Sequence, residues 1–112
     1  MITQNYINGE FLDSSSGRTI DVVNPATEDV IAQVPASTTD DVDAAVRAAR
    51  AAFEGPWAKM PARERGRLVY KLGERLMERA DEVARLETLH NGKPIFEARQ
   101  IEIPAAAECL QY

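Results

Sequence analysis

The chain has 112 residues, 45% of them hydrophobic, and its 18 acidic and 13 basic residues give a formal net charge of −5. This composition is typical of one globular domain or part of one, and it excludes a disordered tail. It also argues against nucleic acid as the main partner, since phosphate binding needs a basic surface, and no hydrophobic run is long enough to cross a membrane.

Short strands are predicted in residues 1–36. Asn8-Gly9 lies between aromatic and apolar residues of the stretch 4–12, and this dipeptide favours the type I′ turn of a β-hairpin. Two β-branched runs follow, and each ends at a proline: "TIDVVNP" and "VIAQVP". We therefore expect three or four short strands before the first helix.

Residues 37–112 have the hydrophobic spacing of helices. Thr38 and Asp41 form a candidate capping box, and Gly55-Pro56 is expected to end this first helix. The residues expected on its buried face are Val42, Ala45, Val46, Ala49, Ala52 and Phe53.

A second helix is predicted from near Pro61 to about Leu89 or His90, where Gly92 and then Pro94 stop it. Its expected buried face comprises Leu68, Val69, Leu72, Leu76, Ala80 and Val83. A third helical stretch is predicted to break at Pro104, because proline lacks a backbone N–H and clashes one turn back.

The last residues, up to Tyr112, continue the third helical stretch without a cap, a glycine or a polar tail. Helices with apolar faces need a surface to pack on, and a few short strands offer little. We therefore expect a truncated or partial chain that lacks most of its sheet and folds poorly when isolated.

The single histidine and the single cysteine give little support for a catalytic or metal site. His90 is the only histidine, so a histidine-rich metal site is excluded within the chain. His90 is expected at the C-terminal end of a helix, where the helix dipole stabilises a partly charged imidazole. Cys109 is the only cysteine, which is typical of a reducing compartment, and it has no basic neighbour to lower its pKa. Both residues are predicted to be structural, and the protein is expected to be cytoplasmic.

Three short motifs also give little evidence of a function. "NGKP" lacks the spaced glycine and the Ser or Thr of a phosphate loop, and no GxGxxG is present. Ser14 in "LDSSS" is similar to the attachment serine of small acidic carrier proteins, but it precedes a loop and not an apolar helix. Arg63, Arg65 and Arg67 are expected to pair with nearby acids or to lie on a solvated face. From these residues alone, the chain is a soluble α/β fragment without a self-sufficient active site.

The ordered series of segments, from about Tyr6 to Tyr112, resembles the N-terminal segment of the aldehyde dehydrogenase superfamily. The segments that carry the resemblance are "YINGEF", "VVNPATEDVIAQVPAS", "DVDAAVRAARAAF", "PW", "RGRLVYKLGERL" and "LETLHNGKP". The resemblance implies an α/β fold in which residues 1–112 are the N-terminal part of a Rossmann-like cofactor-binding domain. It also implies a parent enzyme that forms homodimers or homotetramers.

Members of that superfamily oxidise aldehydes to carboxylic acids with NAD or NADP, and a cysteine thiolate attacks the carbonyl to form a thiohemiacetal. A glutamate then activates the water that releases the acid. The resemblance places this cysteine, this glutamate and the main cofactor contacts beyond the present segment. The implied partner is therefore a small-molecule aldehyde, and the 112 residues alone are expected to be inactive.

Two sites of the superfamily reach into this segment. Many members hold a monovalent cation with backbone carbonyls just before Asn-Pro, here Val22 and Val23, and with an acidic side chain at the position of His90. Hard cations prefer oxygen ligands, which an imidazole does not offer. Ala105 lies in a helix that resembles one bordering the substrate tunnel. Glu28 departs from the glycine of many members, so its turn lacks an easy positive φ.

The expected function is thus that of a partial aldehyde dehydrogenase. The alternative is a standalone, non-catalytic helical interaction module or remnant of the same ancestry. That alternative requires polar residues on a helix face that the enzyme buries, whereas Val42, Val46 and Leu72 are apolar.

Overall fold

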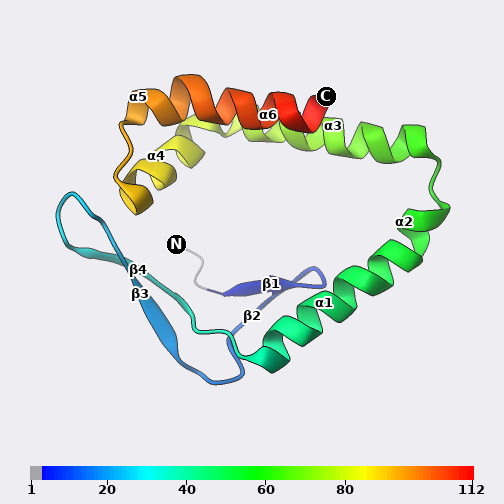
Figure 1. The fold of residues 1–112 in the computed structure, drawn as a ribbon, viewed down its shortest axis with the longest axis horizontal. Coiled ribbons are helices and arrows are strands. Elements are labelled where there is room, and N and C mark those ends of the chain that lie inside the picture. The colour runs from blue at the N-terminus through cyan, green and yellow to red at the C-terminus, as the bar shows by residue number, and fades with distance from the viewer. Residues whose placement is uncertain (1–3) are drawn as a thin grey trace. The chain divides into compact units, whose positions relative to one another are not determined.

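The computed structural model describes residues 4–112. The chain divides into two compact units. One contains residues 4–23 and Val30–Lys59, and the other contains Asn24–Asp29 and Met60–Tyr112. The loop 24–29 therefore belongs to the helical unit, although the strands on either side of it do not. Figure 1 labels the elements.

The predicted hairpin is confirmed. Strands β1 (Asn5–Ile7) and β2 (Glu10–Leu12) pair antiparallel, with Tyr6 opposite Phe11. Asn8 has φ 53° and Gly9 has φ 85°, the two positive values that a type I′ turn requires. The rings of Tyr6 and Phe11 lie 5.0 Å apart and support the pairing as a cross-strand aromatic pair.

The second predicted strand pair is also confirmed. Strands β3 (Thr19–Val23) and β4 (Val30–Pro35) form a separate antiparallel sheet. Their register shifts between Val22 and Val23, because Val22 pairs with Ala32 while Val23 pairs with Val30. One residue of β4 is therefore bulged out at the end of the sheet that leads into the loop 24–29.

Helix α1 (Thr39–Glu54) begins at the predicted capping box, and a short helix α2 (Pro56–Lys59) follows. The predicted buried face of α1 is wrong for its large residues: Val42, Val46 and Phe53 are exposed by 53, 60 and 61%. Within this unit only the small hairpin covers the helix, and it faces Ala45, Ala48 and Ala49. The apolar pattern is real, but no other described residue of this unit covers the rest of it.

The second predicted helix is in fact two helices, α3 (Ala62–Glu78) and α4 (Ala80–Asn91). The chain turns at Arg79, which has φ −109° and ψ 18°. Its guanidinium bonds Glu82 in the first turn of α4, with Nε 2.8 Å from Oε2. The turn lets Ala84 of α4 contact the buried Ala98 and Ile103, a tertiary gain that helical spacing alone does not reveal.

The predicted break at Pro104 is confirmed only in part: a new α-helix does start there, with Pro104 in its first turn, but the helical path is not interrupted. Helix α5 (Ile95–Glu97), a π-helical turn (Ala98–Glu102) and α6 (Ile103–Gln111) form one continuous helical rod. The N–H of Ile103 donates to the carbonyl of Ala98, five residues back, so the ladder has already widened before the proline. The wide turn makes room for the proline ring, so the ring does not clash with the turn before it.

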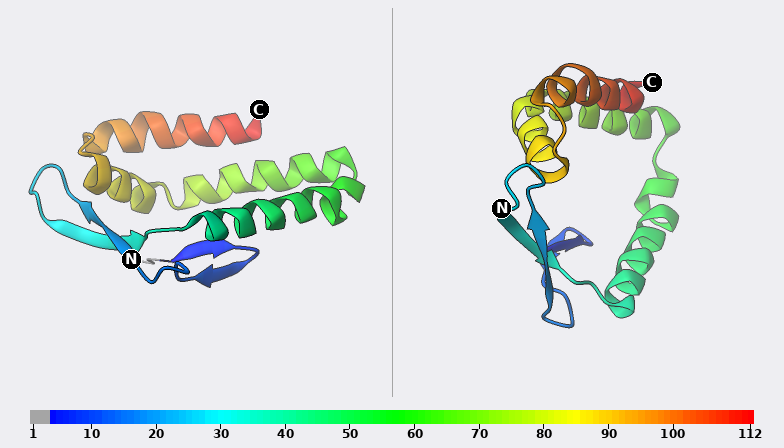
Figure 2. Two further views of the ribbon diagram at one scale, coloured as in Figure 1. Left: turned by 60° about the horizontal axis from the view of Figure 1, so that its bottom comes forward. Right: turned by 60° about the vertical axis from the view of Figure 1, so that its left-hand side comes forward.

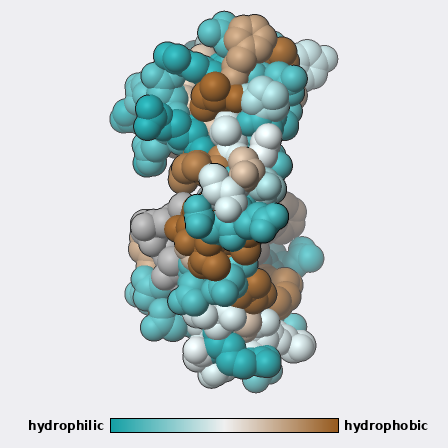
Figure 3. Space-filling model, turned by 90° about the vertical axis from the view of Figure 1, so that its left-hand side faces the viewer, coloured by the Kyte–Doolittle hydropathy of each residue, from teal (hydrophilic) through white to brown (hydrophobic). Residues whose placement is uncertain are grey.

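The core of the helical unit is small. Its buried hydrophobic residues are Ala84, Ala98, Ile103 and Ala107, and no large side chain of residues 4–112 is fully buried. Of the face predicted for residues 61–90, Leu76, Ala80 and Val83 pack on this core, whereas Leu68, Val69 and Leu72 are exposed. Figure 3 shows brown hydrophobic side chains among hydrophilic ones on the molecular surface. Poor folding of the isolated chain stays a prediction.

The loop 24–29 contains the one backbone conformation that the sequence leaves unsupported. Glu28 has φ 62°, and its N–H donates to the carbonyl of Asn24 at 2.8 Å. A left-handed conformation costs a non-glycine residue about 1–2 kcal/mol. We therefore expect Glu28→Gly to raise the free energy of unfolding by about 1 kcal/mol, measured by urea unfolding, after the entropy cost of glycine.

The matched control is Ala26→Gly in the same loop, where φ is not positive. This substitution only adds freedom to the unfolded chain, so it should lower stability. Equal effects of the two substitutions would show that the φ of Glu28 carries no strain.

Candidate functional site

The turn Asn91–Pro94 at the end of α4 is held by hydrogen bonds from both its backbone and its side chains. Gly92 takes the left-handed conformation with φ 79°, and its N–H donates to the carbonyl of Thr88 at 3.0 Å. The Asn91 amide nitrogen donates to Oε1 of Glu87 at 2.6 Å, and the Asn91 amide oxygen accepts from the N–H of Lys93 at 2.8 Å. The predicted helix end is confirmed as a glycine cap with a side-chain clamp.

The loop 24–29 lies against this turn. A Cβ atom added to Gly92 would lie 2.8 Å from Cγ of Pro25. Asn24 is buried, its side-chain oxygen accepts from the N–H of Ala26 at 2.9 Å, and its carbonyl accepts from Glu28. The Asn-Pro and Asn-Gly-Lys-Pro motifs, 67 positions apart in a chain of 112 residues, thus form one contact.

Lys93 connects the turn to the π-helical segment. Its ammonium bonds the carboxylate of Glu102 and lies 3.7 Å from Oε1 of Glu87, and its side chain is 25% exposed. The hydrogen bond to Glu102 raises the pKa of Lys93 above its ordinary value, and the negative charge of Glu87 acts in the same direction. The amine therefore stays protonated and serves as a charge and not as a nucleophile or base.

A second polar cluster surrounds the start of α1. The Ser14 hydroxyl is buried, lies 2.7 Å from the carbonyl of Ala36, and also reaches Oδ2 of Asp41 at 3.1 Å. The N–H of Ser15 donates to Asp41 at 3.2 Å, and the N–H of Thr38 donates to it at 2.8 Å. Ser14 is thus a buried part of a helix cap, which argues against its use as a carrier attachment site.

The Asp41 carboxylate predicts a pH dependence of stability. The backbone hydrogen bond from Thr38 lowers its pKa from 3.8 to about 2 in the folded chain. Because the folded pKa is depressed, the stabilisation is present above pH 3.8 and is lost as the pH falls through 2. We expect the unfolding temperature of the native protein to fall more steeply over this window than that of Asp41→Asn. Asp43→Asn, whose carboxylate lies outside the cluster, should keep the native slope.

The residues proposed for the cation site lie in different compact units. Val22 and Val23 are in β3, at the bulge, and His90 is an exposed residue in the last turn of α4. Among residues 4–112, no group of three histidine, cysteine or acidic side chains has a geometry that could hold a metal ion. The position of His90 agrees with its predicted role at the negative end of the helix dipole.

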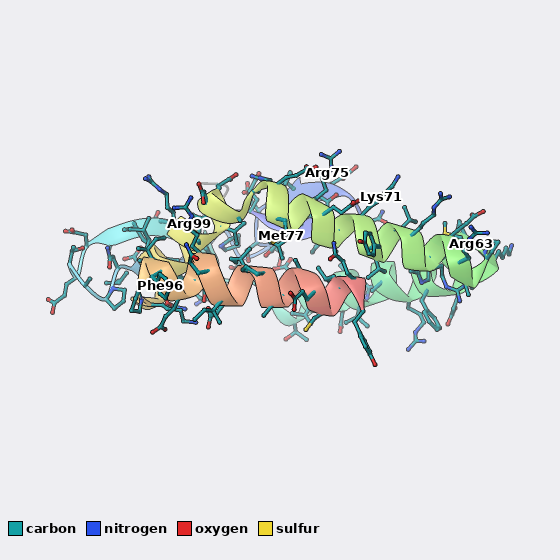
Figure 4. All side chains as sticks on the ribbon, turned by 90° about the horizontal axis from the view of Figure 1, so that it is seen from above. Arg63, Lys71, Arg75, Met77, Phe96 and Arg99 are labelled. Carbon is teal, nitrogen blue, oxygen red and sulfur yellow. The ribbon has the colours of Figure 1, made fainter. Side chains whose placement is uncertain are left out.

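The remaining candidate residues are exposed. Ala105 and Cys109 lie one turn apart on α6, and both are open to solvent. Figure 4 shows Arg63, Lys71 and Arg75 projecting from α3, and Arg75 pairs with Glu78 on the same helix. Of the three arginines of the sequence cluster, Arg63 and Arg67 are exposed, as the solvated-face alternative expects, whereas the guanidinium of Arg65 donates to the carbonyl of Met60 and not to an acid. No helix of the described residues is long and apolar enough to cross a membrane.

The Lys93–Glu102 pair was not predicted from the sequence. The two residues are nine positions apart, and the π-helical turn shifts the register between them, so helical spacing gives no signal for this contact. The Gly92–Pro25 contact was also missed, although the glycine after asparagine was correctly predicted to end the helix.

Comparison with known proteins gives a consistent result. The profile described as "Aldehyde dehydrogenase family" matches residues 11–112. The chain is 48% identical over 107 residues to an aldehyde dehydrogenase of Alternaria alternata, covering 96% of this chain and 22% of that protein. It is 43% identical over 111 residues to aldehyde dehydrogenase 1 of Tanacetum cinerariifolium, covering 98% of this chain and 22% of that protein.

Comparison with solved structures also finds close similarity to an aldehyde dehydrogenase. The NAD+ complex structure of aldehyde dehydrogenase from Bacillus cereus has a TM-score of 0.96 and 47% identity, and the match covers 100% of this chain and 23% of that one. The structure of PnpE in complex with nicotinamide adenine dinucleotide has a TM-score of 0.95 and 44% identity, with the same coverage. The chain therefore spans 22–23% of the length of these relatives.

Proposed function

The chain belongs to the aldehyde dehydrogenase family, and we propose that its 112 residues serve as the N-terminal part of an enzyme that oxidises an aldehyde to a carboxylic acid. The observation that carries the proposal is the family match over residues 11–112, together with identities of 43–48% to aldehyde dehydrogenases. The chemistry proceeds through a cysteine thiohemiacetal, and a glutamate activates water to release the acid.

The cofactor of the proposed enzyme is NAD or NADP, which accepts the hydride when bound. Two similar structures are NAD complexes, which supports this choice. A dinucleotide pyrophosphate is commonly held by a glycine-rich loop at a helix N-terminus. The helix starts of residues 4–112 show a threonine cap at α1 and proline starts at α3 and α5, which do not fit that pattern. We therefore assign no cofactor contact to these residues.

The proposed contribution of this chain is positioning. The contact of Gly92 with Pro25 fixes the end of α4, and Lys93 fixes the same turn to the π-helical segment through Glu102. The continuous rod then carries Ala105 on the exposed side of α6. We propose that Ala105 borders the substrate tunnel, where its small side chain leaves room for the aldehyde. The 112 residues alone are expected to be inactive.

We propose only the backbone carbonyls of Val22 and Val23 as ligands of a monovalent cation. A carbonyl oxygen is a suitable ligand for a hard cation, and the imidazole of His90 is not. We therefore propose that monovalent cations affect this enzyme weakly. Replacement of sodium and potassium by choline in the assay should change its rate by less than about twofold, and His90→Asp should increase the dependence.

The proposed partners are a small-molecule aldehyde and further copies of the same protein, as a homodimer or homotetramer. The proposed compartment is the cytoplasm. Neither nucleic acid nor a membrane is proposed as a partner, in line with the acidic net charge of −5.

The test of the proposed function is the formation of reduced nicotinamide by the product of the complete gene. The protein is mixed with NAD+ or NADP+ and with each member of a panel of aliphatic and aromatic aldehydes, and absorbance is followed. Aldehyde-dependent reduction with an equal amount of carboxylic acid is expected, while the isolated 112 residues should show none. No reduction with any aldehyde by a folded product would contradict the proposal.

A further inference from the structure

The chain contains the dipeptide Asn-Gly twice, at Asn8-Gly9 and at Asn91-Gly92. Asparagine is among the thermolabile residues of proteins. In Asn-Gly, the backbone nitrogen of glycine attacks the side-chain amide carbon of asparagine most easily, because glycine has no side chain to hinder the approach. The same dipeptide thus occurs in two different environments, which allows a comparison within one molecule.

The environment of Asn91 opposes this attack. The glycine nitrogen that would attack donates its hydrogen to the carbonyl of Thr88 at 3.0 Å. The amide that would be attacked is held at both ends, by Glu87 at 2.6 Å and by the N–H of Lys93 at 2.8 Å. The glycine also lies against Pro25, so the turn has little room to rearrange.

The environment of Asn8 leaves the dipeptide open. Asn8 and Gly9 are both exposed, and a Cβ added to Gly9 would meet no atom within 4 Å. Within residues 4–112, no hydrogen bond holds the Asn8 side chain or the N–H of Gly9. The hairpin around this turn has three residues in each strand, and two-stranded hairpins of this kind open readily.

We infer that Asn8 is a site of spontaneous deamidation and isoaspartate formation, and that the fold protects Asn91. The Gly9 nitrogen loses its proton and forms a bond to the Asn8 amide carbon, and ammonia leaves, which gives a cyclic succinimide. Water then adds to one of the two imide carbonyls and opens the ring to aspartate or isoaspartate. The net reaction consumes one water and releases one ammonia, and no oxidant or reductant takes part.

The product changes the hairpin in two ways. It places a negative charge at the turn, and isoaspartate adds one carbon to the main chain. Because a two-residue turn sets the register of its strands, the longer main chain disrupts the pairing of Tyr6 with Phe11. The modification site is therefore also a site at which the edge of this unit changes its structure with age.

The test is peptide mapping by mass spectrometry after incubation of the full-length protein in mildly alkaline buffer at body temperature. Loss of one net hydrogen bond changes an equilibrium about tenfold, so Asn8 should convert at least about tenfold faster than Asn91. Labelling with an isoaspartate methyltransferase should locate the isoaspartate at the same residue. Equal conversion of the two sites, or faster conversion of Asn91, would overturn the inference.

Two controls separate the fold from the local sequence. In urea the two sites should convert at similar rates, and a difference that persists there would overturn the assignment to the fold. Glu87→Ala removes the acceptor of the Asn91 amide, so it should speed conversion at Asn91 and leave Asn8 unchanged. Asn24 provides an internal reference, because it precedes Pro25, which has no N–H to attack.

Discussion

Gly92→Ala is expected to lower the free energy of unfolding by about 2–4 kcal/mol, the largest effect among the substitutions considered. Two costs add at this position. The residue has φ 79°, where an alanine costs about 1–2 kcal/mol. The new Cβ would also lie 2.8 Å from Cγ of Pro25, and the rigid proline ring cannot rotate away. Urea unfolding of the product of the complete gene and of its Gly92→Ala variant measures the difference in the free energy of unfolding.

Gly17→Ala separates these two costs. Gly17 also has a positive φ, 65°, but a Cβ there would meet no atom within 4 Å. We expect this control to cost only the backbone term of about 1–2 kcal/mol. If Gly92→Ala were no more destabilising than Gly17→Ala, the contact between the loop 24–29 and the helix end would have no energetic role.

Gly73→Ala is expected to have the second largest effect, because Gly73 lies where α3 and α6 touch. Figures 1 and 2 show these helices side by side. A Cβ at Gly73 would lie 2.9 Å from the backbone oxygen of Ala107 and 2.9 Å from Cγ of Gln111. The Gln111 side chain can move, but the backbone oxygen moves only with α6. The helices must therefore separate, at a cost of about 1–3 kcal/mol.

The matched control is Gly66→Ala on the same helix, where nothing lies within 4 Å of the added atom. Both substitutions gain the helix propensity of alanine, about 1 kcal/mol. This gain cancels in the comparison, so the difference between the two unfolding free energies reports the packing cost alone. We expect Gly66→Ala to stabilise the protein and Gly73→Ala to fall below it by about 1–3 kcal/mol. Equal stabilisation by both would contradict the close helix contact.

Local chemistry explains which elements could be predicted from the sequence. The hairpin at Asn8-Gly9 and the cap of Thr38 with Asp41 depend on neighbouring residues only, and both were predicted correctly. The glycine cap at Gly92 is of the same kind. In each case a few adjacent residues determine the backbone conformation, so no distant contact is needed for the prediction.

The wrong or missing predictions concern places where the backbone conformation depends on contacts formed only in the folded chain. Arg79 has no helix-breaking chemistry, and the chain turns there because Ala84 gains a packing partner in Ala98 and Ile103. Pro104 is tolerated because the π-helical turn before it widens the backbone. The Lys93–Glu102 pair depends on that same widening. Spacing along the sequence cannot report these features, since each depends on residues that approach only in the folded chain.

The candidate site was predicted only in its parts. The motifs around Asn24-Pro25 and Gly92-Lys93 were recognised, but their mutual contact was not. The predicted face of α1 shows a related limit, because periodicity identifies an apolar stripe and not the surface that covers it. Val46 and Phe53 fit the stripe and are nevertheless exposed among the described residues.

The most direct test of the proposal that these 112 residues serve in an aldehyde dehydrogenase is to read the coding sequence past the codon of Tyr112. We expect the reading frame to continue past Tyr112, which follows α6 directly, and to supply, later in the chain, a cysteine and a glutamate in the motifs of the family. A stop codon directly after Tyr112 would contradict the proposal, because the 112 residues would then have to act without a catalytic centre.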